Sequence, residues 1–310
     1  MGNFIKVIEI WTPAPEQQGL KLADAIYGKY GGLKQASEQC IFAYDEDLPG
    51  KAWSTATPQI ISGPDHPYLH HMDPVARAGI NTGLVIPIFT GEFLNSVVVI
   101  LCGEIQNRAG AIELWGKRDD KASELSLLQG YYGSLQKLEQ ATQRIQFARG
   151  SGLPGSAWDY HIPMVVEDMI ATRLFKRASA AVIEGITAAI GLPFSYYTNK
   201  EYVLTFLSAH STPIAQRFEI WIPERENEHL FFHAGICQKG EDLFALHNKT
   251  HIRRGEDILG KVWLTGTPAI SHDLVKDQLI NKSETTELTT GFVMPMIEEG
   301  FLKSVVVFMF

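Results

Sequence analysis

The sequence lacks a cysteine framework. Its three cysteines, Cys40, Cys102 and Cys237, are odd in number and far apart, and none belongs to a Cys-x-x-Cys pair. A disulfide-stapled domain and a zinc cluster would each need paired or closely spaced cysteines. Both classes are therefore excluded, and a reducing compartment is expected.

Long apolar runs and basic clusters are also missing. No stretch reaches the ~18 apolar residues of a membrane-spanning helix, and the first residues lead into a strand-like segment rather than a signal peptide. The net charge is −8, with lysine and arginine scattered along the chain. A phosphate backbone would find no basic stripe to contact. We expect a cytoplasmic protein that binds no nucleic acid and spans no membrane, although a removed targeting peptide would leave no trace.

One short motif occurs three times in the 310 residues. Each copy contains a glycine followed three residues later by a tryptophan, and each glycine lies 105 residues after the previous one. The pairs are Gly50 and Trp53, Gly155 and Trp158, and Gly260 and Trp263. An internal repeat of this length predicts three small domains, at residues 1–106, 107–213 and 214–310.

Proline spacing supports the same division. Five residues after each motif tryptophan comes a proline, and a later proline in each unit lies ten residues before a valine of the last apolar segment. These later pairs are Pro87 and Val97, Pro193 and Val203, and Pro295 and Val305.

Each unit shows one order of predicted elements. In the first unit we expect strands at 4–11, 19–30, 82–89 and 93–102, and helices at 33–40 and 68–78. The second unit follows the same plan, with a helix expected at 173–183. The motif is expected to be a turn in which glycine permits positive φ while the tryptophan fills the core, in preference to a ligand-binding loop.

A Glu-x-Trp sequence opens each unit. Beside a tryptophan packed in the core, the glutamate of such a strand is expected on the solvent side. The three pairs are Glu9 and Trp11, Glu113 and Trp115, and Glu219 and Trp221.

This order of elements resembles the GAF domain, a small α/β sensor module. The resemblance is clearest at residues 254–273 and 175–193, the latter similar to GAF domains of bacterial sensor proteins, and the three copies cover nearly the whole chain. It implies an α+β fold of three tandem GAF-like domains, each a central antiparallel sheet with helices mainly on one face.

The resemblance also implies a ligand pocket in each repeat, walled by the segment after the motif, the following helix and the closing strands. Polar groups in these segments are the candidate ligand-binding residues: Asp65, Arg77, Asp168, Arg173, Arg177, His272 and Asp273. GAF domains bind diverse ligands or none, so the ligand is unknown and no cofactor is predicted. The cyclic-nucleotide signature, the bilin-attachment cysteine and the clustered cysteines of the methionine-sulfoxide reductase branch are not matched.

Histidine spacing is compatible with metal binding at two places, His229 with His233 and His247 with His251. Neither pair has an equivalent in the other repeats, so surface histidines and no metal site are expected. No catalytic motif is present. The chain is therefore expected not to be an enzyme.

The closing strands are apolar on both faces, although the connectors at 103–111 and 209–218 are too short for a covering helix. Another repeat or another chain must cover the second face. We therefore expect sheet-to-sheet packing among the repeats and self-association through apolar sheet faces.

Two classes of function remain. One is a sensory or regulatory module that binds a small ligand, mediates self-association, or both. The other is a structural scaffold, a self-assembling protein built from GAF-like repeats, which the absence of a visible effector domain favours. A sensor should have an open pocket with convergent polar groups, whereas a scaffold should fill its pockets with its own side chains.

Overall fold

The computed structural model describes residues 3–310 except 15, 17, 64, 72–77, 104–109, 225–227 and 282–286. It contains three six-stranded antiparallel sheets, one in each third of the chain, which we call the first, second and third repeats. Their strand orders are β3-β2-β1-β6-β5-β4, β9-β8-β7-β12-β11-β10 and β15-β14-β13-β18-β17-β16. The same order three times confirms the predicted GAF-like tandem architecture.

The strands of the first repeat are β1 (Ile5–Ala14), β2 (Gly19–Ile26), β3 (Phe42–Ala43), β4 (Gln59–Ser62), β5 (Thr82–Thr90) and β6 (Phe93–Cys102). Those of the second are β7 (Gly110–Gly116), β8 (Glu124–Tyr131), β9 (Gln146–Ala148), β10 (Met164–Val166), β11 (Ala188–Ser195) and β12 (Glu201–Ser208). Those of the third are β13 (Arg217–Pro223), β14 (His229–Cys237), β15 (His251–Arg253), β16 (Ala269–Ser271), β17 (Gly291–Glu298) and β18 (Phe301–Met309).

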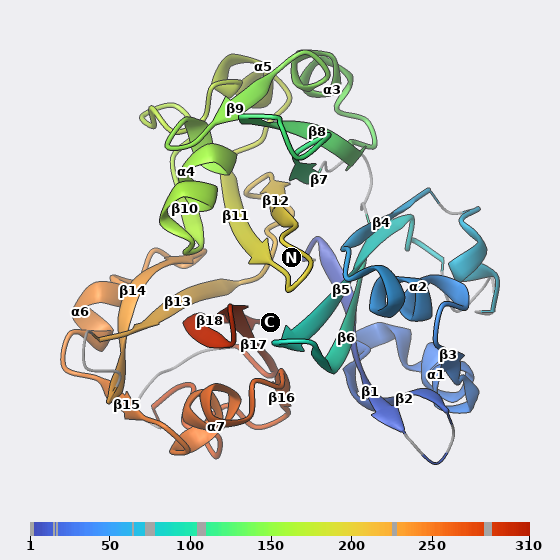
Figure 1. The fold of residues 1–310 in the computed structure, drawn as a ribbon. Helices are drawn as coiled ribbons and strands as arrows, with labels where there is room; N and C mark the ends of the chain where they lie inside the picture. Colours follow the sequence, from blue (N-terminus) through green and yellow to red (C-terminus); the bar gives the residue numbers. More distant parts are fainter. Residues whose placement is uncertain are drawn as a thin grey trace.

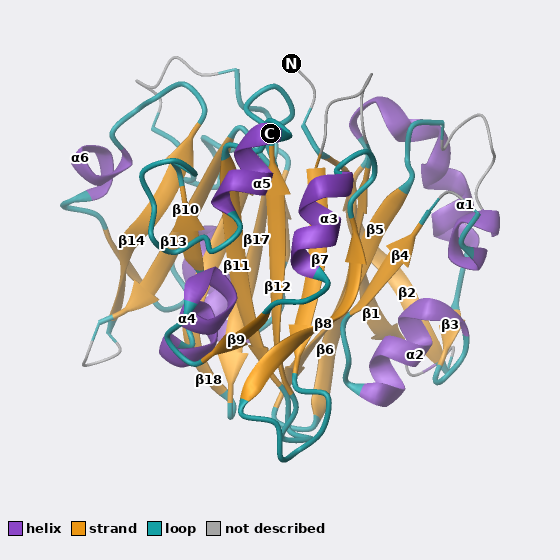
Figure 2. Ribbon diagram, turned by 90° about the horizontal axis from the view of Figure 1, so that it is seen from above, coloured by secondary structure: helices purple, strands orange, loops and turns teal. Residues whose placement is uncertain are grey.

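Helices lie on the outer side of each sheet (Figures 1 and 2). The α-helices are α1 (Lys34–Gln39), α2 (Asp47–Thr55), α3 (Gln136–Thr142), α4 (Gly152–Tyr160), α5 (Ala178–Ile183), α6 (Leu243–His247) and α7 (Asp257–Thr265). The 3₁₀ segments η2 (Gly28–Leu33) and η3 (Pro67–His71) lie in the first repeat. The second predicted strand ends at Ile26 and the helix predicted at 173–183 begins only at Ala178. Most of the helix predicted at 68–78 lies outside the described residues.

The proline–valine spacing reflects strand pairing. Pro87 lies opposite Val97, and the corresponding pairs in the other sheets are Pro193 with Val203 and Pro295 with Val305. The short neighbouring strand β4 pairs only with Thr82 to Val85 of β5. Pro87 therefore lies beyond that strand, where its missing N–H leaves no ladder bond unmade.

The three sheets pack against one another around a shared central core (Figure 1). Val98 and Ile100 of β6 face this core, while Val97 and Val99 face the outer core of the first repeat. Strand β18 divides its side chains in the same way. Because successive side chains point to opposite sides of a sheet, both faces of these strands are buried. The predicted sheet-to-sheet packing among repeats is confirmed.

Contacts at the sheet edges close the three repeats into a ring. Strand β4 contacts β8 of the second repeat, β10 contacts β14 of the third, and β16 contacts β2 of the first. At the first of these edges the Ile60 N–H donates to Gln129 Oε1 at 2.9 Å. One head-to-tail contact used three times is the arrangement of a closed cyclic trimer, built here within a single chain.

The motif glycines are helical, so the expectation of positive-φ turns is wrong. None of the three has positive φ, and all lie within α2, α4 and α7. A Cβ on Gly50 would lie 1.9 Å from the Ala43 carbonyl oxygen, and at Gly155 and Gly260 the corresponding distance is 2.1 Å. Glycine is required because the helix presses against backbone, not because of φ.

No helix in the described part of the chain has the length and apolar character to cross a membrane.

Candidate ligand-binding site

The glutamate of each Glu-x-Trp strand is buried, contrary to the expected solvent-side position. Glu9 and Glu113 are 0% exposed and Glu219 is 1% exposed. In every repeat the tryptophan Nε1 donates to the glutamate two residues earlier, at 3.1, 3.0 and 2.8 Å respectively. Residues two apart share one face of a strand. The core tryptophan was therefore the signal, available in the sequence, that its glutamate is buried too.

In the first repeat, the carboxyl of Glu9 accepts bonds from neutral groups. Ser37 Oγ lies at 2.6 Å, Tyr27 OH at 3.0 Å and Tyr68 OH at 3.4 Å. Burial raises the pKa of Glu9 above its usual value, and these hydrogen bonds only partly oppose that effect. The first repeat thus holds a carboxyl that tends toward its uncharged form.

In the second repeat, Arg177 fills the corresponding space. Its guanidinium binds both oxygens of Glu113, through Nη1 to Oε1 and through Nη2 to Oε2, the latter at 3.0 Å. It also lies 5.3 Å from the ring centre of Trp115 and 4.7 Å from that of Phe175. Burial alone would raise the pKa of Glu113, but the Arg177 charge and hydrogen bonds hold it below its usual value.

In the third repeat, the partners of Glu219 come from its own strand and from α6. Arg217 Nε donates to Oε1 at 2.5 Å, and His247 Nε2 lies 2.9 Å from the same oxygen. His247 is only 8% exposed, so its expected surface position is wrong. Burial opposes ionisation, but His247 and Arg217 hold the pKa of Glu219 below its usual value. The imidazole Nε2 also lies 2.7 Å from Arg217 Nη2, so the tautomer decides which partner it bonds.

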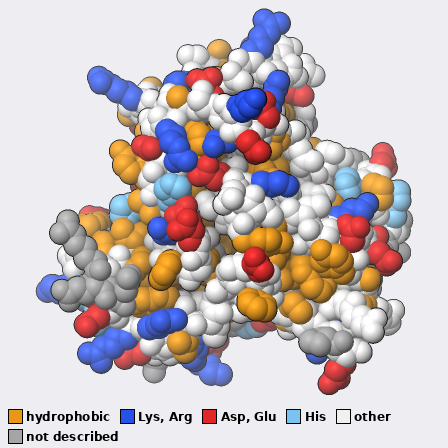
Figure 3. Space-filling view, viewed as in Figure 1, with side chains coloured by type: hydrophobic (Ala, Val, Ile, Leu, Met, Phe, Trp, Pro, Cys, Tyr) orange, Lys and Arg blue, Asp and Glu red, His pale blue; other side chains and the backbone are white. Residues whose placement is uncertain are grey.

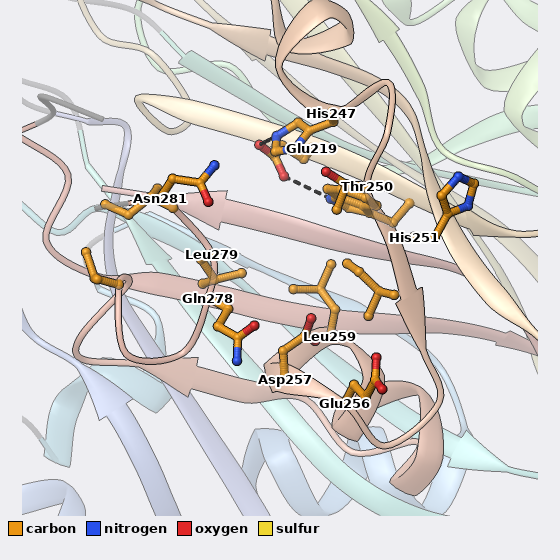
Figure 4. A pocket seen from close by; sticks show the side chains of 14 residues that line it. Glu219, His247, Thr250, His251, Glu256, Asp257, Leu259, Gln278, Leu279 and Asn281 are labelled. Atoms are coloured by element: carbon orange, nitrogen blue, oxygen red, sulfur yellow. Dashed lines mark hydrogen bonds and ion pairs between the residues drawn. The ribbon is translucent and has the colours of Figure 1, made fainter. Parts of the chain in front are cut away.

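The space next to this carboxyl is closed in two repeats and open in the third. Tyr68 occupies it in the first repeat and Arg177 in the second. Tyr68 comes from the segment after β4, and Arg177 comes from the corresponding segment after β10. In the third repeat a cavity of about 490 Å³ lies there, with Glu219, Trp221 and His247 among its lining. Figure 4 shows Gln278, Leu279 and Asn281 on one side and Asp257 and Glu256 on another. This volume suits a small molecule.

Asp257 brings a partly buried carboxylate to this cavity. It begins α7 with a φ of 42°, and Asp47 at the start of α2 has a φ of 50°. Aspartate tolerates this left-handed conformation better than most residues. Asp257 Oδ1 accepts the Gly260 N–H at 3.0 Å, and burial is the main reason that its pKa is raised.

None of the described candidate residues chosen from the sequence lines the cavity beside Glu219. Asp65 and Arg173 are exposed, and Arg77 lies outside the described residues. Asp168 and Asp273 are exposed and accept backbone N–H groups of their own turns.

Two of these candidates bind groups that were not foreseen. Arg177 is buried against Glu113, and His272 lies 3.0 Å from Asp24 of the first repeat. The pocket residues missed from the sequence are Glu219, His247, Asp257 and Gln278, whose separation along the chain gave no signal that they meet.

The motif tryptophans pack beside their helices. Trp158 and Trp263 are 3% and 8% exposed, and Trp53 is partly buried. Within the described residues, no group of three His, Cys, Asp or Glu side chains is arranged to hold a metal ion.

Comparisons with known proteins give structural matches alone. No family model and no curated protein matches the chain. A Staphylococcus aureus NreA protein mutated in its nitrate binding site is 16% identical with a TM-score of 0.28, covering 34% of this chain and 78% of that one. The GAF domain of an Acinetobacter phosphoenolpyruvate-protein phosphotransferase is 11% identical with a TM-score of 0.25, covering 31% and 55%. A free methionine-R-sulfoxide reductase from Thermoplasma acidophilum is 13% identical with a TM-score of 0.24, covering 31% and 60%.

Proposed function

We propose that this protein is a non-enzymatic sensory or regulatory module of three domains, at 1–106, 107–213 and 214–310, in which the third binds a small ligand. The observation that carries the proposal is the contrast among the repeats. The space beside the strand glutamate holds Tyr68 in the first repeat and Arg177 in the second, but it is a cavity in the third. The first two repeats serve to build the ring that supports the third.

The lining of the cavity suits binding better than catalysis. Its described lining residues include no cysteine, serine or lysine, although they do include the hydroxyl of Thr250 and the carboxyl groups of Glu256 and Asp257. Glu219 already accepts bonds from Arg217 and Trp221, so it is held in place rather than poised to take a proton from a substrate.

The apolar sheet faces that were expected to mediate self-association are buried within the chain. The apolar sheet faces meet one another in the central core, inside a single chain. Any assembly would use a different surface, such as the hairpin ends where Phe93 and Phe301 are 81% and 71% exposed. Figure 3 shows hydrophobic side chains gathered near the centre of the face that is drawn there.

Native mass spectrometry of the protein purified from its source tests the proposal, because it reports retained ligand and assembly state together. We expect one small molecule per chain. The variant Val275→Trp, at the lining of the cavity, should lose this mass, whereas the control Val182→Trp, on the second repeat, should keep it. An empty wild-type chain that forms a higher-order assembly would favour the scaffold instead.

A further inference from the structure

The two filled sites show what chemistry the strand glutamate and its tryptophan accept. In the second repeat the occupant is a flat guanidinium that donates to both carboxylate oxygens and lies near three aromatic rings, Trp115, Phe147 and Phe175. In the first repeat it is the phenol of Tyr68, which donates to Glu9. Both occupants are planar hydrogen-bond donors. Neither is an acceptor-only or anionic group.

The charges around the cavity of the third repeat favour the same kind of occupant. Three carboxyl groups line it, those of Glu219, Glu256 and Asp257, together with the imidazoles of His247 and His251, and no lysine or arginine is among its described lining residues. Glu219 forms a buried ion pair with Arg217, and the exposed Glu256 lies 3.9 Å from Arg253. The third carboxyl, that of Asp257, accepts the Gly260 N–H, and its charged neighbours are Lys261 and Glu256.

The start of α7 does not offset this preference. The N–H groups at a helix N-terminus attract anions. Here Asp257 Oδ1 itself accepts the Gly260 N–H, so a carboxylate of the protein already holds the position that an anion would take. A second anion would meet Asp257 and Glu256 at close range.

We infer that the cavity of the third repeat binds a small organic cation, an alkylguanidinium or primary alkylammonium. Its charged head would lie between Glu219 and Asp257, and its alkyl part would pack on Trp221 and Leu259. A carboxylate that gains a charged donor makes one of the stronger hydrogen bonds in proteins. This inference rests on the proposed function, because it names the class of ligand for that same site.

Four probes with one butyl chain separate charge from size: butylguanidinium, butylammonium, butyrate and 1-butanol. Isothermal titration calorimetry of the whole chain should show saturable binding of the two cations, one per chain, and none of the other two, at concentrations up to about 10 mM. Asp257→Asn should weaken cation binding by about tenfold or more. Asn keeps the left-handed conformation accessible.

The matched control is Asp47→Asn, the same substitution at the same helix position in the first repeat, which should leave binding unchanged. Butyrate or butanol binding as well as the cations would overturn the inference about charge and leave a small-molecule site intact. A cation that binds equally to the Asp257→Asn variant would also overturn it. If no probe binds and native mass spectrometry finds the chain empty, both the inference and the proposed function fail.

Discussion

Replacing Arg177 with methionine tests how the second repeat holds a charge in its core. Methionine keeps much of the arginine stem but removes the guanidinium, so Glu113 would remain 0% exposed with only neutral donors such as Tyr132 and Thr205. Breaking a buried ion pair by removing one partner costs about 3–5 kcal/mol of unfolding free energy. The variant should lose stability in this range at pH 7.

The loss should depend on pH in a defined direction. In the native protein the pKa of Glu113 is lowered, so its stabilisation is fully present above the unfolded pKa of about 4.3 and is lost only as pH falls further. Without Arg177 the carboxyl should resemble Glu9, whose pKa is raised, and should bind a proton in the folded state. Supplying that proton costs about 3.7 kcal/mol at pH 7 but about 1 kcal/mol at pH 5. The defect should therefore shrink on acidification.

Urea unfolding at pH 5 and pH 7 measures both effects. Arg173→Met is the control, because Arg173 is exposed and only four residues away, and it should change stability by less than about 0.5 kcal/mol. The double variant Glu113→Gln/Arg177→Met should recover part of the loss at pH 7, since no charge remains buried. A loss below about 1 kcal/mol at pH 7, or one that is the same at both pH values, would refute the argument.

Three further predictions concern the other repeats and the ring. Glu9→Gln should cost less than about 1 kcal/mol because that carboxyl tends to be uncharged, whereas Glu113→Gln should cost about 3 kcal/mol by leaving Arg177 unpaired; equal effects in urea unfolding would contradict this. Gly260→Ala should destabilise by about 1–3 kcal/mol because its Cβ would meet the Arg253 carbonyl oxygen. The control is Gly31→Ala, at a position with open space and an ordinary φ, and it should be nearly neutral. Thermal unfolding of the two variants measures the difference in stability. A fragment of residues 1–213 should aggregate or bind a hydrophobic dye, because it exposes the faces that pack on β17 and β18; a monodisperse folded fragment in size-exclusion chromatography would show that the central core is dispensable.

Much of the fold could be predicted because the evidence was local and repeated. The Pro87 and Val97 spacing is an ordinary hairpin register, and the continuous apolar runs of β6 and β18 require burial on both faces. From that alone it followed that another sheet must cover the second face. The local sequence does not show which sheet covers this face. A neighbouring repeat and a second chain are both compatible with it, and the choice depends on connector geometry across more than 100 residues.

The motif and the strand glutamates show where pattern reasoning failed. Glycine was explained by backbone φ, its commonest use, but here its role is close approach, since only the packed helix brings the Ala43 carbonyl within 1.9 Å of where a Cβ would be. The glutamates were placed outside on residue type. The period of two along a strand, applied strictly to Trp11, would have placed Glu9 inside.

The sequence by itself determined the three repeats, the order of their elements and the need to cover two apolar faces, because periodicity and composition act over short stretches. Tertiary structure alone decided what lies beside each strand glutamate. Tyr68 reaches Glu9 from 59 residues away, Arg177 reaches Glu113 from 64, and His247 reaches Glu219 from 28. Identical strand motifs thus became a carboxyl with a raised pKa, an ion pair and an open pocket, because each was completed by a side chain that only folding brings to it.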